Sequence, residues 1–187
     1  MNKFIKKNKT LLFNLIEKID SKKIEILAKN FKKFKFSKNN KLIFLGNGGS
    51  ASICNHVTVD LSKNAGIRSI NFNEANLITC LSNDYGHDNW MKEALKIHCL
   101  KNDFVIFISS SGESKNIINA SEWCRRNKIK MATFSGFKDN NSLKKNNKNG
   151  INFWIDSKAY NHVELCHLYI LLTIVDMIIG KFVYKFS

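Results

Sequence analysis

The sequence of 187 residues contains no proline, and arginine occurs only at Arg68, Arg125 and Arg126. Lysine therefore supplies nearly all of the positive residues behind the formal charge of +15. Proteins that recognise nucleic acid usually present arginine side chains and exposed aromatic rings, and this sequence shows neither pattern. We interpret the charge mainly as the codon bias of an AT-rich genome, with some added attraction for phosphates, and expect no nucleic-acid partner.

The sequence also lacks paired cysteines and long apolar runs. Its five cysteines are scattered without a CxxC pair, which is typical of reduced thiols that fill the core rather than of a disulfide framework or a thiolate zinc site. The longest apolar run, Leu168 to Ile179, is interrupted by Thr173 and Asp176 and is shorter than the roughly 18 residues of a membrane helix. Residues 1–7 lack the apolar stretch of a signal peptide. We therefore expect a cytoplasmic protein with no membrane partner.

From Lys41 onward, short apolar runs alternate with amphipathic segments. Strand-to-helix alternation of this kind predicts an α/β fold, with a parallel sheet and helices on both faces. A helical pair within 3–36, with a break at Asp20-Ser21, precedes it. We expect one domain, with 1–40 as a helical extension and 41–187 as the α/β core. The predicted strands are 42–45, 67–72, 104–108, 130–134 and 151–155; the predicted helices lie near 50–63, 75–82, 88–98, 114–126, 140–146 and 160–183.

The first predicted strand runs into Gly46-Asn47-Gly48-Gly49-Ser50 and then into a helix. Glycines let the backbone approach a ligand closely, and the amides at a helix N-terminus attract anions. Taken alone, this loop is ambiguous. It also satisfies the GxGxxA pattern of dinucleotide-binding proteins, with Glu74 available as the ribose acid. A tight turn with a purely structural role is the third reading.

A second loop favours a phosphate monoester. Ser109, Ser110, Ser111 and Ser114 surround a glycine at the start of another helix, and a simple N-cap would explain one of these serines, not four. Both loops follow strands, and open α/β sheets bind ligands at the carboxyl ends of their strands. We expect a small phosphorylated ligand and no nucleotide cofactor.

These residues resemble the sugar isomerase (SIS) domain family, and in particular the bacterial phosphoheptose isomerases. The resemblance rests on "LGNGGSAS", "ISSSGES" and the segment Asn83-Asp84-Tyr85-Gly86, and it extends from about Lys41 to the C-terminus. It implies a flavodoxin-like, three-layer sandwich with a five-stranded parallel sheet, and a homotetramer with active sites shared between subunits. By the same resemblance, the residues that contact the sugar phosphate would be Asn47, Gly48, Ser50, Asp84, Ser109, Ser110, Ser111 and Ser114.

The resemblance also implies a catalytic set. In the family, a histidine and a glutamate four residues apart follow the glycine loop, the last helix adds a glutamine and a histidine, and several members bind zinc with this set. Here the first pair is His56 and Asp60, Glu164 stands at the glutamine position, and Leu172 stands where the distal histidine is expected.

His167 lies three residues after Glu164, so it could replace the lost histidine. We therefore expect Asp60, Glu164 and His167 to be catalytic, and His56, Asp60, Glu164 and His167 to hold zinc. Core packing of His167 and a surface ion pair for Asp60 are the structural alternatives.

The leading hypothesis is a phosphosugar isomerase that interconverts sedoheptulose 7-phosphate, or a similar ketose phosphate, with an aldose through an enediol. Such a reaction would serve heptose and surface-polysaccharide precursor synthesis, for lipopolysaccharide or capsule. The alternative is a non-catalytic SIS protein that binds phosphosugars or acts as an adapter for a replication initiator. Leu172 favours this alternative, whereas the retained ionisable set favours an enzyme.

Overall fold

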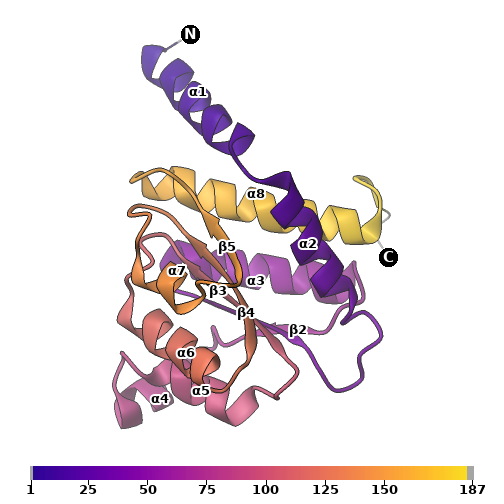
Figure 1. The fold of residues 1–187 in the computed structure, drawn as a ribbon, viewed down its shortest axis with the longest axis vertical. Coiled ribbons are helices and arrows are strands. Elements are labelled where there is room, and N and C mark those ends of the chain that lie inside the picture. The colour runs from indigo at the N-terminus through magenta and orange to yellow at the C-terminus, as the bar shows by residue number, and fades with distance from the viewer. Residues whose placement is uncertain (1, 185–187) are drawn as a thin grey trace.

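The computed structural model describes residues 2–184 and contains one sheet of five parallel strands in the order β2-β1-β3-β4-β5 (Figure 1). The predicted α/β class and the parallel sheet are therefore confirmed. The strands are β1 (Leu42–Gly46), β2 (Ser69–Asn71), β3 (Phe104–Ser109), β4 (Lys130–Ser135) and β5 (Ile151–Trp154).

The central strands are buried on both faces, as apolar sequence without polar alternation predicts. In β1, Leu42 and Phe44 face one core cluster while Ile43 and Leu45 face the other. The first cluster lies under α2 (Ser21–Lys32), α3 (Gly48–Lys63) and α8 (Tyr160–Ile179). The second lies under α4 (Ala75–Tyr85), α5 (Trp90–His98) and α6 (Lys115–Arg126). The sheet is thus the middle layer of three, as Figure 1 shows.

The helices that follow the strands agree with the prediction in number and order. They are α3 (Gly48–Lys63), α4 (Ala75–Tyr85), α5 (Trp90–His98), α6 (Lys115–Arg126), α7 (Ser142–Asn146) and α8 (Tyr160–Ile179). The predicted end of the last helix at 183 is wrong. Gly180 takes a left-handed conformation (φ +84°), which ends the helix there.

Two helices precede the sheet, α1 (Lys3–Glu17) and α2 (Ser21–Lys32). Asp20 caps α2 with its side chain, which explains the break between them. Leu27 and Phe31 of α2 are fully buried in the core. In contrast, α1 has no buried residue and projects from the body of the molecule (Figure 1).

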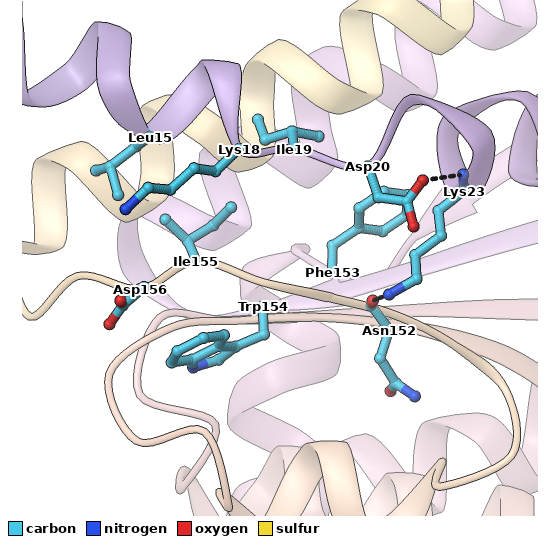
Figure 2. Close-up of a pocket in the computed structure, with 10 residues that line it drawn as sticks. All are labelled: Leu15, Lys18, Ile19, Asp20, Lys23, Asn152, Phe153, Trp154, Ile155 and Asp156. Carbon is cyan, nitrogen blue, oxygen red and sulfur yellow. Dashed lines mark hydrogen bonds between the residues drawn. The ribbon is translucent and has the colours of Figure 1, made fainter.

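The connection between α1 and α2 lies against the edge strand β5, where it encloses a pocket of about 240 Å³ (Figure 2). The Lys23 ammonium group donates a hydrogen bond of 3.4 Å to the carbonyl oxygen of Asn152 on β5. Lys23 belongs to α2, so its side chain covers part of the exposed edge of the sheet. Asp20 and Lys23, two of the polar residues that line this pocket, thus cap α2 and hold α2 against β5, and both roles are structural.

Among residues 2–184, α8 is the one helix long and apolar enough to cross a bilayer by length and composition. However, half of that stretch is buried inside the protein. Val163, Ile170, Leu171 and Ile174 belong to the core cluster on one face of the sheet. A core helix meets the same criterion, and we interpret α8 as one.

Strand β1 pairs directly with β3, with Gly46 opposite Ile108 at their carboxyl ends. The glycine loop and the serine loop therefore leave the sheet side by side. This pairing, which sequence order does not reveal, creates the candidate site.

Candidate active site

The glycine loop joins β1 to α3. Asn47 precedes the helix in an extended conformation, but its side chain forms no capping hydrogen bond. Gly48 has a φ of +52°, a conformation that residues with side chains rarely adopt. The first amides of α3 are therefore not occupied by a capping side chain, as expected of an anion site.

The serine loop joins β3 to α6. Ser109 holds the turn, because its carbonyl and hydroxyl oxygens accept hydrogen bonds of 3.0 and 3.2 Å from the Gly112 amide. Ser114 stands at the N-cap of α6 but forms no side-chain cap, and its hydroxyl lies 3.5 Å from that of Ser109. The amides at the start of α6 therefore also lack a capping side chain.

A reciprocal pair of amides ties the two loops together. Asn47 donates to Asn116 Oδ1 at 2.9 Å, and Asn116 donates back to Asn47 Oδ1 at 3.0 Å. Asn116 is only 2% exposed. The sequence interpretation missed this residue. The sequence contains one sign of its importance. Asn116 is polar, yet its spacing of four residues from Ala120 and eight from Cys124 places it on the buried face of α6.

Between the loops lies a pocket of about 120 Å³. A water molecule occupies roughly 30 Å³ in the liquid, so the space suits a phosphate group and little more. The structure thus gathers most of the predicted phosphate-binding residues at one place, while phosphate binding itself stays a prediction. The lining residues are Asn47, Ser50, Ile108, Ser109, Ser110, Ser111, Ser114, Tyr160 and Glu164.

Glu164 of α8 brings a carboxylate to this pocket. The Ser110 hydroxyl lies 3.5 Å from Glu164 Oε1, and the carboxyl group packs against the Cα of Gly49. A carboxylate repels a phosphate group but accepts hydrogen bonds from sugar hydroxyls. The serine side of the pocket therefore offers hydroxyl groups and uncapped helix amides, whereas the Glu164 side offers hydrogen-bond acceptors.

His56 and Asp60 form the predicted pair further along α3. Their Nε2 and Oδ2 atoms lie 3.3 Å apart, and Asn64 donates to the other Asp60 oxygen at 3.1 Å. The His56 side chain is 52% exposed and that of Asp60 is 19% exposed. The pair therefore faces the molecular surface, where a ligand or a second chain can reach it.

His167 does not join this pair, which corrects the prediction. It is fully buried, its Nε2 lies 3.1 Å from the Ser135 carbonyl oxygen, and its ring packs edge-on against Phe134. Burial lowers the pKa of His167 to about 4, so the neutral ring is a core group. Three residues along a helix is a rotation of about 60° away from Glu164, enough to turn the side chain inward.

The predicted four-residue metal cluster is consequently not assembled. Residues 2–184 of the single chain contain no group of three or more histidine, cysteine, aspartate or glutamate side chains arranged to hold a metal ion. Glu164 stands at the serine pocket, whereas His56 and Asp60 stand further along α3.

Two other predicted acidic residues are placed elsewhere. Asp84 is exposed at the end of α4, where it accepts a hydrogen bond of 3.0 Å from Asn83, and it does not line the serine pocket. Glu74 accepts a hydrogen bond of 2.9 Å from the Leu77 amide as the N-cap of α4. Glu74, which the dinucleotide interpretation needed as the ribose-binding acid, therefore has a structural role as a helix cap.

No family model matches the sequence. A phosphoheptose isomerase of Buchnera aphidicola is 30% identical over 168 residues, which are 84% of this chain and 82% of that protein. The chain belongs to the phosphoheptose isomerase family. Phosphoheptose isomerase 2 of Campylobacter jejuni is 33% identical over 129 residues, 66% of this chain but only 61% of that relative, less than two thirds of its length.

Solved structures of this family share the fold. The phosphoheptose isomerase GmhA of Neisseria gonorrhoeae superposes with a TM-score of 0.82 at 18% identity, covering 91% of this chain and 92% of that one. The enzyme of Francisella tularensis gives 0.82 at 21% identity, covering 97% and 100%. The predicted family and the predicted SIS fold are therefore confirmed.

Within this family the chain departs from the expected pattern at Leu172. Leu172 is partly buried and packs against the core cluster beneath α8. Neither it nor the buried His167 supplies an acid–base group, so the ionisable side chains left in the predicted set are Glu164, His56 and Asp60.

Proposed function

We propose that the protein is a phosphosugar isomerase that interconverts sedoheptulose 7-phosphate, or a similar ketose phosphate, with the corresponding aldose phosphate. The observation that carries this proposal is the serine-lined pocket between two helix N-termini without side-chain caps, in a chain whose relatives are named phosphoheptose isomerases. Those names support an isomerase and give no support to the adapter alternative.

The reaction moves a proton between neighbouring carbons through an enediol. A base removes the proton beside the carbonyl group, and the developing oxyanion must be neutralised before the proton returns to the adjacent carbon. The phosphate would anchor the far end of the sugar among the serine hydroxyls and the helix amides. The substrate's own length then decides which protein group meets the reacting carbons.

This anchoring favours Asp60 over Glu164 as the base. Glu164 borders the phosphate pocket, whereas a 7-phosphate has its reacting carbons at the opposite end of the chain. His56 and Asp60 lie six and ten residues beyond Ser50 on α3, rises of about 9 and 15 Å along the helix, so this pair stands farther from the phosphate pocket than Glu164 does. In this proposal Asp60 takes the proton, and His56 stabilises the negative charge of the Asp60 carboxylate. Glu164 binds a sugar hydroxyl near the phosphate.

The implied zinc ion does not fit the residues of one chain. His56 and Asp60 offer two donors, and zinc sites with a catalytic role usually have three protein ligands. Zinc stays a proposal that needs a second subunit to complete the ligand set, and we assign no step to it. Activity measured with added zinc and with a chelator tests this part separately.

We also propose that the protein is a homotetramer whose subunits share active sites. Two observations support it. On α1, which has no buried residue, Phe4 is 75% and Phe13 is 61% exposed, and on α8 Leu165 and Tyr169 are exposed as well. Apolar faces of this kind usually mark contacts with another chain. A mass of one subunit from light scattering would refute this proposal.

We propose a cytoplasmic location and a role in supplying heptose precursors for surface polysaccharide. Both follow from the proposed reaction, since sedoheptulose 7-phosphate is an intracellular sugar phosphate. They are tested by the loss of heptose from surface polysaccharide when the protein is removed.

A proton-exchange experiment tests the central proposal. Sedoheptulose 7-phosphate is incubated with the protein in deuterated water, and deuterium bound to carbon is followed by NMR. We expect incorporation that falls by about 10²- to 10⁴-fold in Asp60→Asn. Asp139→Asn, which changes an exposed aspartate away from the site, is the matched control and should behave as wild type. Sugar-phosphate binding without any incorporation would indicate the non-catalytic alternative.

A further inference from the structure

His87 stands beside the candidate site, next to Asn116. It lies in the connection between α4 and α5, directly after Gly86, whose φ is +79°. Asn119 of α6 donates a hydrogen bond of 2.8 Å to the Asp88 carbonyl oxygen, and Asn89 donates one of 3.0 Å to the Tyr85 carbonyl oxygen. The backbone after His87 is therefore tied to α6, and the second bond closes the loop around His87.

The His87 ring meets the amide pair that joins the two loops. Its Nε2 lies 3.5 Å from Asn116 Nδ2, at the outer limit of a hydrogen bond. Asn116 uses its other amide hydrogen on Asn47, and its Oδ1 accepts from Asn47, so the amide group faces His87 as a donor. In the tautomer whose Nε2 accepts from this amide, the ring hydrogen lies on Nδ1.

That Nδ1 atom has no hydrogen-bond partner among residues 2–184, and the His87 side chain is exposed. The neighbouring serine pocket, at about 120 Å³, holds a phosphate group but not a seven-carbon sugar. The sugar chain must therefore leave the pocket across its rim, which Asn47 and Glu164 both border. Asn47 forms part of that rim, and through Asn116 it is connected to His87.

We propose that His87 is a substrate-binding residue whose Nδ1–H donates a hydrogen bond to a hydroxyl group of the sugar where it emerges past Asn47. This inference rests on the proposed function, because it takes a sugar phosphate as the ligand of the serine pocket. It assigns to the loop between α4 and α5 a direct part in distinguishing a long sugar phosphate from free phosphate.

Two substitutions separate this role from mere support of Asn116. Asparagine places its amide near the position of Nδ1, whereas glutamine places it near Nε2. If His87 binds sugar, His87→Asn should retain binding, and His87→Gln and His87→Ala should lose it. If His87 only positions Asn116, glutamine should be the better replacement and the loss should extend to inorganic phosphate.

The experiment measures, by calorimetry, the dissociation constants of sedoheptulose 7-phosphate and of inorganic phosphate. We expect His87→Gln and His87→Ala to weaken sugar-phosphate binding by about three- to tenfold, as loss of one hydrogen bond does, with phosphate binding unchanged. His87→Asn should stay within about twofold of wild type. His98→Asn, which changes another exposed histidine that packs on Phe72, is the matched control and should match wild type.

The outcomes distinguish this inference from the proposed function. A wild-type protein that binds and isomerises the sugar, with all three His87 variants equal to it, overturns the inference alone. Equal weakening for inorganic phosphate also overturns it, in favour of a positioning role. A wild-type protein that binds neither probe overturns the proposed function and this inference together.

Discussion

The carboxyl group of Glu164 packs on the Cα of Gly49, so closely that a Cβ at position 49 would lie 2.7 Å from Glu164 Cδ. This contact joins the start of α3 to α8 at the rim of the serine pocket. It also explains why the glycine loop contains a glycine that the backbone conformation does not demand: Gly49 is not among the glycines with positive φ. A side chain at position 49 would instead have to push the Glu164 carboxyl group aside.

Gly49→Ala should therefore displace Glu164 and weaken sugar-phosphate binding. In a Glu164→Ala background the clash is gone, and the same substitution should be neutral or stabilising, because alanine is a better helix former than glycine by about 1 kcal/mol. Thermal unfolding and ligand binding of the two single variants and the double variant measure the coupling. Additive effects of the two substitutions would contradict the proposed clash.

The reciprocal pair of Asn47 and Asn116 should hold the loops in place. Asn47→Ala leaves one amide hydrogen of the buried Asn116 without its acceptor, whereas Asn116 Oδ1 still accepts from the Ile117 amide. An unsatisfied buried group costs about 1–3 kcal/mol. We expect a lower free energy of unfolding together with weaker binding of inorganic phosphate. Asn140→Ala, on a surface turn, is the control. Unchanged phosphate affinity in Asn47→Ala would show that the pair does not shape the pocket.

His167 should make the stability of the fold depend on pH. Its pKa is about 4 in the folded protein and 6.5 when the group is solvated, so the unfolded chain binds a proton that the folded chain rejects between these values. The contribution of this group to stability is present above pH 6.5 and is lost as the pH falls. Between pH 8 and pH 5 the loss should be about 2 kcal/mol.

Urea denaturation at the two pH values measures this loss. His167→Gln has no titrating ring, so its stability should fall less over the same range, even though it starts lower because it loses the packing on Phe134. The carboxylates are common to both proteins and cancel in the comparison. Parallel pH profiles would contradict the assignment.

Thiol chemistry should distinguish Cys80 from the other four cysteines. Cys80 is exposed, whereas Cys54, Cys124 and Cys166 are buried and Cys99 is partly buried. Desolvation raises the pKa of Cys99 and of Cys166 to about 11, so their reactive thiolate is scarce near neutral pH.

In a reaction with a disulfide reagent at pH 8 we expect one fast thiol in the native protein. Cys80→Ser should remove this fast phase, and denaturation should expose the remaining thiols. Several fast thiols in the native protein would show that the core opens more readily than its packing indicates.

Much of this architecture could be predicted from local sequence. Apolar runs such as 42–45 and 104–108 are long enough and apolar enough to specify strands that are buried on both faces. The glycine and serine loops are local too, because the turn, the start of the helix and the hydroxyl groups lie within a few consecutive residues. Their place at the carboxyl ends of parallel strands follows from the fold class.

The sequence by itself thus determined the family, the parallel α/β fold and the two loops of the serine pocket. Only the tertiary structure decided which side chains meet there: Glu164 lines the pocket, Asn116 joins its two loops through Asn47, His87 lies against Asn116, and His167 turns into the core. The physical reason is that helix spacing fixes the angle between two residues but not the direction of the helix face. That direction is set by how α6 and α8 pack on the sheet, through contacts between residues far apart in the chain.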